Sequence, residues 1–171
     1  IMNTEKFNIA SDSKNDIEAW LSNLSHNPFE LNGITYASIE SFWQSLKFEK
    51  WSELWLNCIN LFWPESKKYW KKSENKSIFS YEWNDYIVWS QEHQNLMKIA
   101  LKAQLNQNLD KLKLLLSTGN IDLIHKPQKE DWSYYADSKT IPWEVFSRFL
   151  MELREEFREF SNIENNTKTW V

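Results

Sequence analysis

The stretch TYASIESFWQSLKF (residues 35–48) places a carboxylate, an amide and an amine inside one short aromatic segment. At helical spacing Glu40, Gln44 and Lys47 share one face, because residues i, i+4 and i+7 stack above one another. An apolar stripe of the same spacing runs beside them: Ile39, Phe42, Trp43 and Leu46. The polar row is therefore either the solvated boundary of a buried helix or the wall of a site, and spacing alone leaves both interpretations open.

The residues before this stretch indicate how it begins. Asn32-Gly33 lies between short alternating apolar runs, a pattern typical of a β-hairpin. Ser38 is a favourable N-cap residue, and Glu40 then falls in the first helical turn, where the helix dipole favours a carboxylate. The sequence therefore predicts a hairpin that leads directly into a helix.

Helical periodicity recurs along the rest of the chain. The predicted helices cover residues 16–24, 51–63, 89–105, 109–118 and 141–160. Gly119 is placed to end the fourth of these, and Pro142 to open the last. The expected fold is mainly α, a single multihelical domain over residues 16–160 with one small β-hairpin near its N-terminus. Residues 1–15 are predicted to be flexible, and residues 161–171 to be a polar tail.

Composition limits the possible functions. The chain has 171 residues, 11 of them tryptophan, which is enough for one domain with a substantial, ring-rich core. Gly33 and Gly119 are its two glycines, so no glycine-rich phosphate loop is present. A dinucleotide-binding Rossmann domain is thereby excluded.

The net charge of −4 predicts weak general attraction to nucleic acid. A local exception is SKKYWKK, with four lysines: Lys67, Lys68, Lys71 and Lys72. Lysines at i and i+4 repel each other unless an anion lies nearby. The cluster is either a solvated basic turn or a patch that faces a phosphate.

No metal or redox cofactor is expected. Cys58 is the single cysteine and resembles a small buried apolar residue, and the three histidines have no metal-binding spacing: His26, His93 and His125. The sequence shows neither a signal-peptide pattern nor an apolar run long enough to cross a membrane. We therefore expect a cytoplasmic protein without a membrane partner. The oligomeric state is left open.

Several segments keep a recognisable order along the chain: LSN (21–23), PFELNGITYASIESFWQSLKF (28–48), Trp89, the M-x-x-A-L-x-A run of residues 97–103, LLSTGN (115–120), Asp131 with Tyr134, and LMELR (150–154). Taken together, they resemble the NADAR (YbiA-like) family. The resemblance covers about residues 20–155. Each segment is weak alone, but together they keep the family's order and spacing.

The resemblance implies an N-glycosidase. Family proteins are described as cleaving ribosyl–nitrogen bonds, either in early phosphorylated riboflavin-pathway intermediates or in ADP-ribosylated guanine. The residues that match positions used for activity are Glu40, Lys47, Trp89 and Asp131, although Glu130 is adjacent and competes for the last role. Lys47 is a candidate for a Schiff base with the opened sugar. The candidate substrate-binding residues are Asn23, Tyr36, Gln44, Lys67, Lys68, Lys71, Lys72 and Tyr134.

The chemistry required fits these residue types. A carboxylate can stabilise the cationic sugar carbon or activate an attacking group, and a partly buried lysine can attack that carbon itself. A tryptophan can stack on a flat base. The expected partner is a small nucleotide-like molecule, including a modified guanine base in nucleic acid.

The sequence also departs from the family. The region after Asp131 reads YYADSKTIPWEVFS (134–147) and holds no glycine, whereas the family has a glycine-rich element there. Glu144 and Ser147 stand where Asn and Gly are expected, and Ser41 stands where the family has His. This departure supports an alternative function, a catalytically silent module that binds ADP-ribose or a partner protein.

Overall fold

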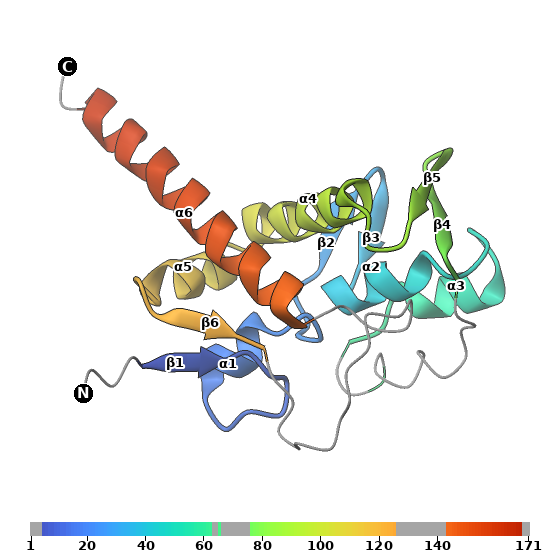
Figure 1. Cartoon of the computed structure of the whole chain (residues 1–171), viewed down its shortest axis with the longest axis horizontal. Helices are drawn as coiled ribbons and strands as arrows, with labels where there is room; N and C mark the ends of the chain where they lie inside the picture. The colour runs from blue at the N-terminus through green and yellow to red at the C-terminus, as the bar shows by residue number, and fades with distance from the viewer. Residues whose placement is uncertain (1–4, 63–64, 66–75, 126–142, 169–171) are drawn as a thin grey trace.

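The helix that carries the opening stretch is α2 (Ile39–Ser45), and every residue in it is buried. Ser38 caps it as predicted. Its hydroxyl accepts a hydrogen bond from the Ser41 N–H, and the Ser41 hydroxyl accepts one from the Ser38 N–H. The computed structural model in Figure 1 describes residues 5–62, 65, 76–125 and 143–168.

The predicted hairpin is confirmed. Strand β2 (Phe29–Leu31) pairs antiparallel with β3 (Ile34–Tyr36), with Phe29 opposite Tyr36. Asn32 and Gly33 form the turn, with φ values of 50° and 78°. Both angles lie in the left-handed region that a two-residue hairpin turn requires. The Phe29 and Tyr36 rings then pack into the core beneath α2.

A second hairpin precedes the long helix α4 (Gln91–Gln107). Strand β4 (Ile78–Tyr81) pairs with β5 (Asn84–Ile87) through a turn at Glu82 and Trp83. Both turn residues have positive φ, 46° and 67°, although neither is Gly or Asn. The usual turn signal is therefore missing from the sequence, which is why this hairpin was not predicted.

A third pair of strands joins distant parts of the chain. Strand β1 (Lys6–Asn8) lies parallel to β6 (Asp122–Ile124), and the N–H of the fully buried Ile9 donates to the Ile124 carbonyl over 2.7 Å. Part of the segment predicted to be flexible, residues 1–15, thus contributes to the core. The predicted fold class is wrong, because the described residues combine helices with three two-stranded sheets in a mixed α/β fold.

The other helices agree with the periodic segments but differ at their ends. They are α1 (Asp16–Leu21), α3 (Glu53–Cys58), α5 (Leu109–Ser117) and α6 (Trp143–Lys168). Gly119 follows α5 with φ 57°, as predicted for a C-terminal glycine. Helix α6 continues to Lys168, well into the predicted tail, and its C-terminal half extends away from the rest of the molecule in Figure 1.

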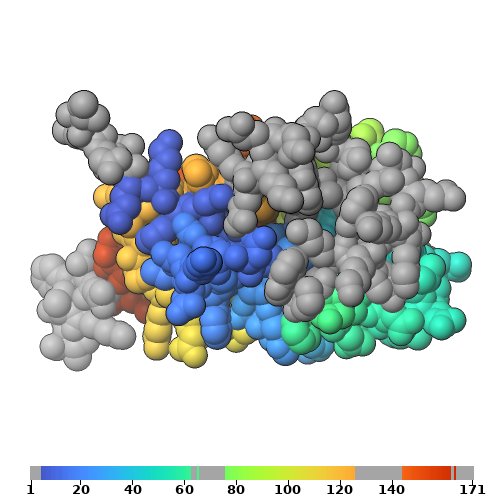
Figure 2. Space-filling view, turned by 90° about the horizontal axis from the view of Figure 1, so that it is seen from below, coloured from blue at the N-terminus to red at the C-terminus, as the bar shows by residue number. Residues whose placement is uncertain are grey.

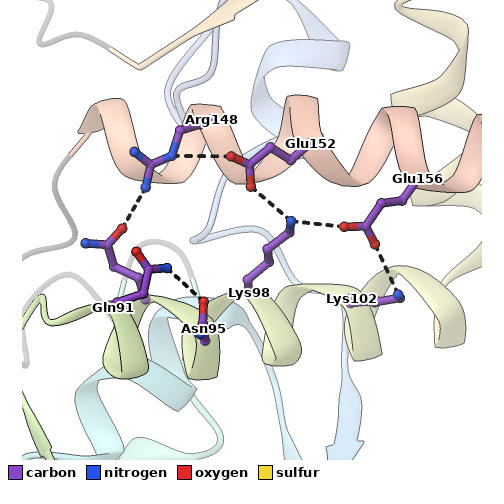
Figure 3. Close-up of polar contacts among 8 residues, drawn as sticks. Gln91, Asn95, Lys98, Lys102, Arg148, Glu152 and Glu156 are labelled. Atoms are coloured by element: carbon purple, nitrogen blue, oxygen red, sulfur yellow. Dashed lines mark hydrogen bonds and ion pairs between the residues drawn. The ribbon is translucent and has the colours of Figure 1, made fainter.

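Ion pairs join α4 to α6 along their exposed edges. The Lys98 ammonium lies 2.9 Å from Glu152 and 3.0 Å from Glu156, and Lys102 lies 3.1 Å from Glu156 (Figure 3). Arg148 extends the row at the N-terminal end of α6 through a contact with Glu152. Two helices about fifty residues apart in sequence are thereby fixed in register. Among the helices described, none is both long and apolar enough to cross a membrane.

Candidate functional site

Glu40 is held at both carboxylate oxygens. The Asn23 side-chain amide donates to Oε2 over 2.6 Å, and the Gln44 amide donates to Oε1 over 2.7 Å. The Glu40 backbone N–H also donates to the Asn23 carbonyl over 2.9 Å. Only 7% of Glu40 is exposed, and Gln44 is fully buried. The polar row is therefore part of the interior, and its carboxylate is fixed in one orientation.

Lys47 follows α2 and is also buried, with 2% of its surface exposed. Its Nζ lies 5.6 Å from the centre of the Trp43 ring, a cation–π distance. The position just beyond a helix C-terminus is favourable for a cation. Lys76 donates to the Lys47 carbonyl over 2.9 Å and fixes the backbone there. The structure thus brings an amine into the buried end of the helix that carries Glu40.

Cys58 of α3 lies close to both charged groups. Burial raises the pKa of its thiol well above the ordinary value, the Glu40 charge raises it further, and the Lys47 charge opposes this. The Sγ atom is 3.6 Å from the Ser41 carbonyl. The thiol therefore stays protonated at neutral pH and is a structural neighbour of Glu40 and Lys47, not a nucleophile.

Trp89 stacks on Trp43, with ring centres 4.6 Å apart and planes 19° from parallel. The prediction that Trp89 belongs to a helix is wrong. Trp89 precedes Ser90, the N-cap of α4, and its backbone is left-handed, with φ 61°. Its side chain is half-buried. An indole thus lies against α2 on the ring of Trp43.

His93 belongs to the same group but was not predicted to be a site residue. It is fully buried, its ring lies 4.9 Å from both Trp43 and Trp89, and its Nδ1 accepts the Trp89 N–H over 2.9 Å. Burial lowers the pKa of His93 to about 4, so the imidazole is neutral at pH 7. The signal available in the sequence was the spacing of Trp89 and His93, four residues apart at the start of a helix.

The other predicted site residues fall into two groups. Tyr36 lies in the aromatic core, edge-on to Phe42 at 5.1 Å, and burial raises the pKa of its hydroxyl. The rest lie outside the described residues: Lys67, Lys68, Lys71, Lys72, Glu130, Asp131 and Tyr134. The structure therefore joins Asn23, Glu40 and Gln44 by hydrogen bonds and places Lys47 and Trp89 on the ring of Trp43. The second carboxylate stays a prediction.

A cavity of about 740 Å³ lies between α1 and α5 and is lined by Trp20, His26, Phe62 and Asp110, among others. Glu40, Lys47 and Trp89 do not line it. Figure 2 shows the N-terminal residues across the centre of the face seen from below. The carboxylate cluster rests on buried polar contacts and is a separate feature from this cavity.

Within the described residues, no group of three His, Cys, Asp or Glu side chains is arranged to hold a metal ion. The side chains that hold Glu40 are amides, and those on the Trp43 ring are an amine, an indole and an imidazole, a set suited to hydrogen bonding and stacking with an organic ligand.

No protein-family model and no curated protein matches the sequence. Among solved structures, the Escherichia coli protein YbiA, determined by NMR, is similar with a TM-score of 0.62 and 20% sequence identity. The match covers 94% of this chain and 89% of YbiA. The YbiA-like fold predicted from the order of the motifs is therefore confirmed, and at this identity the likeness concerns the fold.

Proposed function

We propose that this protein is an N-glycosidase that hydrolyses a ribosyl–nitrogen bond in a phosphorylated, nucleotide-like substrate. The observation that carries the proposal is the arrangement of Glu40, a buried carboxylate whose two oxygens are each held by an amide donor at 2.6–2.7 Å. A carboxylate buried this deeply is costly unless it is well hydrogen-bonded. The YbiA-like fold and the family resemblance of the surrounding motifs support the same activity.

Glu40 has the properties that the reaction needs. As the bond to nitrogen breaks, positive charge develops on the sugar C1, and a fixed anion beside it lowers the energy of that transition state. Water then adds to C1, its proton passes to a base, and the leaving nitrogen takes up a proton. A carboxylate that is already oriented by Asn23 and Gln44 requires little rearrangement for either the stabilising or the base role.

Lys47 offers a second route through the same site. Its amine can attack C1 as the nitrogen leaves, and ring opening of the sugar then gives a Schiff base that water hydrolyses to release the sugar. The adjacent Trp43 ring and the burial of Lys47 limit access of bulk water to the amine. Whether Glu40 alone or Glu40 with Lys47 performs the reaction is decided by trapping the intermediate.

Trp89 is suited to binding the base. Its indole is already stacked on Trp43 and remains half-buried, so a flat purine or pyrimidine can extend the stack. Of the two substrate classes, ADP-ribosylated guanine is preferred here over a riboflavin-pathway intermediate. The sequence carries an altered, glycine-free loop, a departure that suits a specialised member of the family.

The decisive experiment is product analysis by mass spectrometry. The protein and its Glu40→Gln variant are incubated separately with ADP-ribosylated guanosine and with a ribosylaminopyrimidine phosphate. Release of free base and free sugar from one substrate, lost in Glu40→Gln, establishes the activity and selects the substrate class. The matched control is Glu49→Gln, because Glu49 is an exposed carboxylate shortly after the same helix.

Absence of release from either substrate would contradict the proposal. Thermal-shift measurements with ADP-ribose then test the alternative, a silent binding module. Equal stabilisation of the wild type and Glu40→Gln without turnover favours that module. Borohydride trapping during confirmed turnover tests the Schiff base: a mass adduct on Lys47 supports it, and no adduct on Lys47 excludes it. The exposed Lys50 is the control position for non-specific labelling.

A further inference from the structure

Trp89 has a backbone conformation that its residue type rarely adopts. Its φ of 61° lies in the left-handed region, where a side chain with a Cβ is strained, and bulky residues are seldom found there. Such a conformation persists only when the surrounding structure holds it in place. The contacts on either side of Trp89 identify what holds it.

Both peptide groups of Trp89 bond to side chains from the first turn of α4. The Trp89 N–H donates to Nδ1 of His93 over 2.9 Å, and the Trp89 carbonyl accepts from the Gln94 amide over 3.0 Å. An ordinary helix start needs only its N-cap, and here Ser90 already accepts from the His93 N–H. The two side chains therefore reach back to a residue that the helix itself does not require.

Each member of this pair is itself fixed. His93 is fully buried among Trp43, Trp89 and Phe79, the last placed edge-on at 5.7 Å. Burial disfavours its charged form, so Nδ1 remains an acceptor for the Trp89 N–H. The imidazole is thus held at Nδ1 by a hydrogen bond and on its faces and edge by three aromatic rings.

Gln94 is fixed from the other helix. Its Oε1 accepts from the Arg148 guanidinium over 2.6 Å, and Arg148 is paired with Glu152 (Figure 3). The Trp89 carbonyl is thus linked to α6 through Gln94 and Arg148. The row of ion pairs between α4 and α6 ends at Arg148, and two hydrogen bonds through Gln94 continue it to the Trp89 carbonyl.

We propose that His93 and Gln94 are positioning residues that clamp Trp89 in its left-handed conformation and so keep its indole stacked on Trp43. The consequence for catalysis rests on the proposed function, in which Trp89 binds the base. The clamp itself is a statement about the Trp43–Trp89 pair and is measurable without any substrate.

The stacked pair provides a spectroscopic signal. Two nearly parallel indoles 4.6 Å apart couple electronically, and the difference in circular dichroism between the wild type and Trp89→Phe isolates the contribution of the pair. His93→Asn keeps an acceptor near the Nδ1 position, whereas His93→Leu removes it. We expect His93→Asn to retain most of the signal and His93→Leu to lose most of it. Equal signals in folded His93→Leu and wild type would overturn the proposal.

The Gln94 side of the clamp is tested with a matched pair. Gln94→Met removes the donor to the Trp89 carbonyl, and Gln91→Met removes a similar amide on the same helical turn that bonds only to Asn95 among the contacts described. We expect Gln94→Met to weaken the signal and Gln91→Met to leave it unchanged. If His93→Leu fails to fold, the two glutamine variants still test the proposal, because Gln91 is exposed and Gln94 is only partly buried. Identical dichroism signals in Gln94→Met and Gln91→Met would contradict the proposal that Gln94 holds Trp89 in place.

Kinetics then connect the clamp to the reaction. With the substrate identified above, Gln94→Met is expected to lower kcat about tenfold through misplacement of the indole, while Gln91→Met retains wild-type kcat. If Gln94→Met loses the dichroism signal but keeps the wild-type kcat, the clamp holds Trp89 but does not contribute to catalysis. A wild type without turnover refutes the proposed function but leaves the spectroscopic result standing.

Discussion

Asn23 holds Glu40 at two points, with its side-chain amide on the carboxylate at 2.6 Å and its carbonyl on the Glu40 N–H at 2.9 Å. The two residues are 17 positions apart, Asn23 in the turn that follows α1 and Glu40 in the first turn of α2. One residue thereby fixes both the start of the central helix and the orientation of its carboxylate.

Removal of this contact has a measurable cost. We expect Asn23→Ala to lower the free energy of unfolding by about 2 kcal/mol, because a buried carboxylate loses the hydrogen bond from the Asn23 amide. Urea unfolding measures the change. Asn57→Ala, at an exposed position of α3, is the control and should be nearly neutral. A wild-type midpoint in Asn23→Ala would contradict the view that this hydrogen bond holds the site.

Lys111 predicts an unusual pH dependence. It is fully buried, it donates to the Gln104 amide oxygen over 2.7 Å, and burial lowers its pKa to about 7. The unfolded chain keeps this proton up to about pH 10.5, so the unfolded state binds more protons above pH 7. Its contribution to stability therefore rises with pH from about 7, by several kcal/mol in total.

The comparison between wild type and Lys111→Met isolates this contribution. Ionisation of the Cys58 thiol and of Tyr36 acts in the opposite direction at higher pH, because their pKa values are raised in the folded state. In urea unfolding between pH 6 and about 8.5, the free energy of unfolding of the wild type should rise relative to that of Lys111→Met. Lys113→Met is the exposed control. Parallel curves for wild type and Lys111→Met would show that Lys111 is not desolvated in solution.

His93 predicts a loss of stability on mild acidification. Its pKa is lowered to about 4 in the folded state by burial, whereas the unfolded chain takes up the proton near pH 6.5. Stability is thus fully present above pH 6.5 and falls by up to about 3 kcal/mol as the pH approaches 4. Thermal unfolding between pH 7 and about 5 measures the slope before most carboxylates titrate, and His93→Asn should flatten it. An unchanged slope in that variant would assign the acid sensitivity to other groups.

The ion pairs between α4 and α6 should contribute modestly. Lys98 bridges Glu152 and Glu156, and we expect Lys98→Met to lower the free energy of unfolding by about 1 kcal/mol at low salt. The effect should shrink near 1 M salt, because exposed charges are screened. Lys102→Met, which loses a single and more exposed pair, should have a smaller effect. A salt-independent change would indicate that Lys98 acts through packing of its aliphatic chain.

Local features of the chain could be predicted because they depend on neighbouring residues. The Asn32-Gly33 turn, the Ser38 cap and the helix end at Gly119 all follow from backbone preferences that operate over a few residues. The β4–β5 hairpin was not predicted, because Glu82 and Trp83 occupy positions with positive φ, where Gly or Asn would normally signal a turn. The β1–β6 pair depends on a contact between segments more than a hundred residues apart, and no local pattern specifies that contact.

The sequence by itself determined that Glu40 and Gln44 share one face of a helix capped by Ser38, because helical spacing and capping are local properties. The same spacing predicted Lys47 on that face, but the helix ends at Ser45 and Lys47 lies just beyond it. Only the tertiary structure decided that this face is buried, that Asn23 meets Glu40 there, and that Trp89 leaves the helix to stack on Trp43. The physical reason is that periodicity fixes the direction of a side chain relative to its helix. What covers that side chain depends on how distant elements pack.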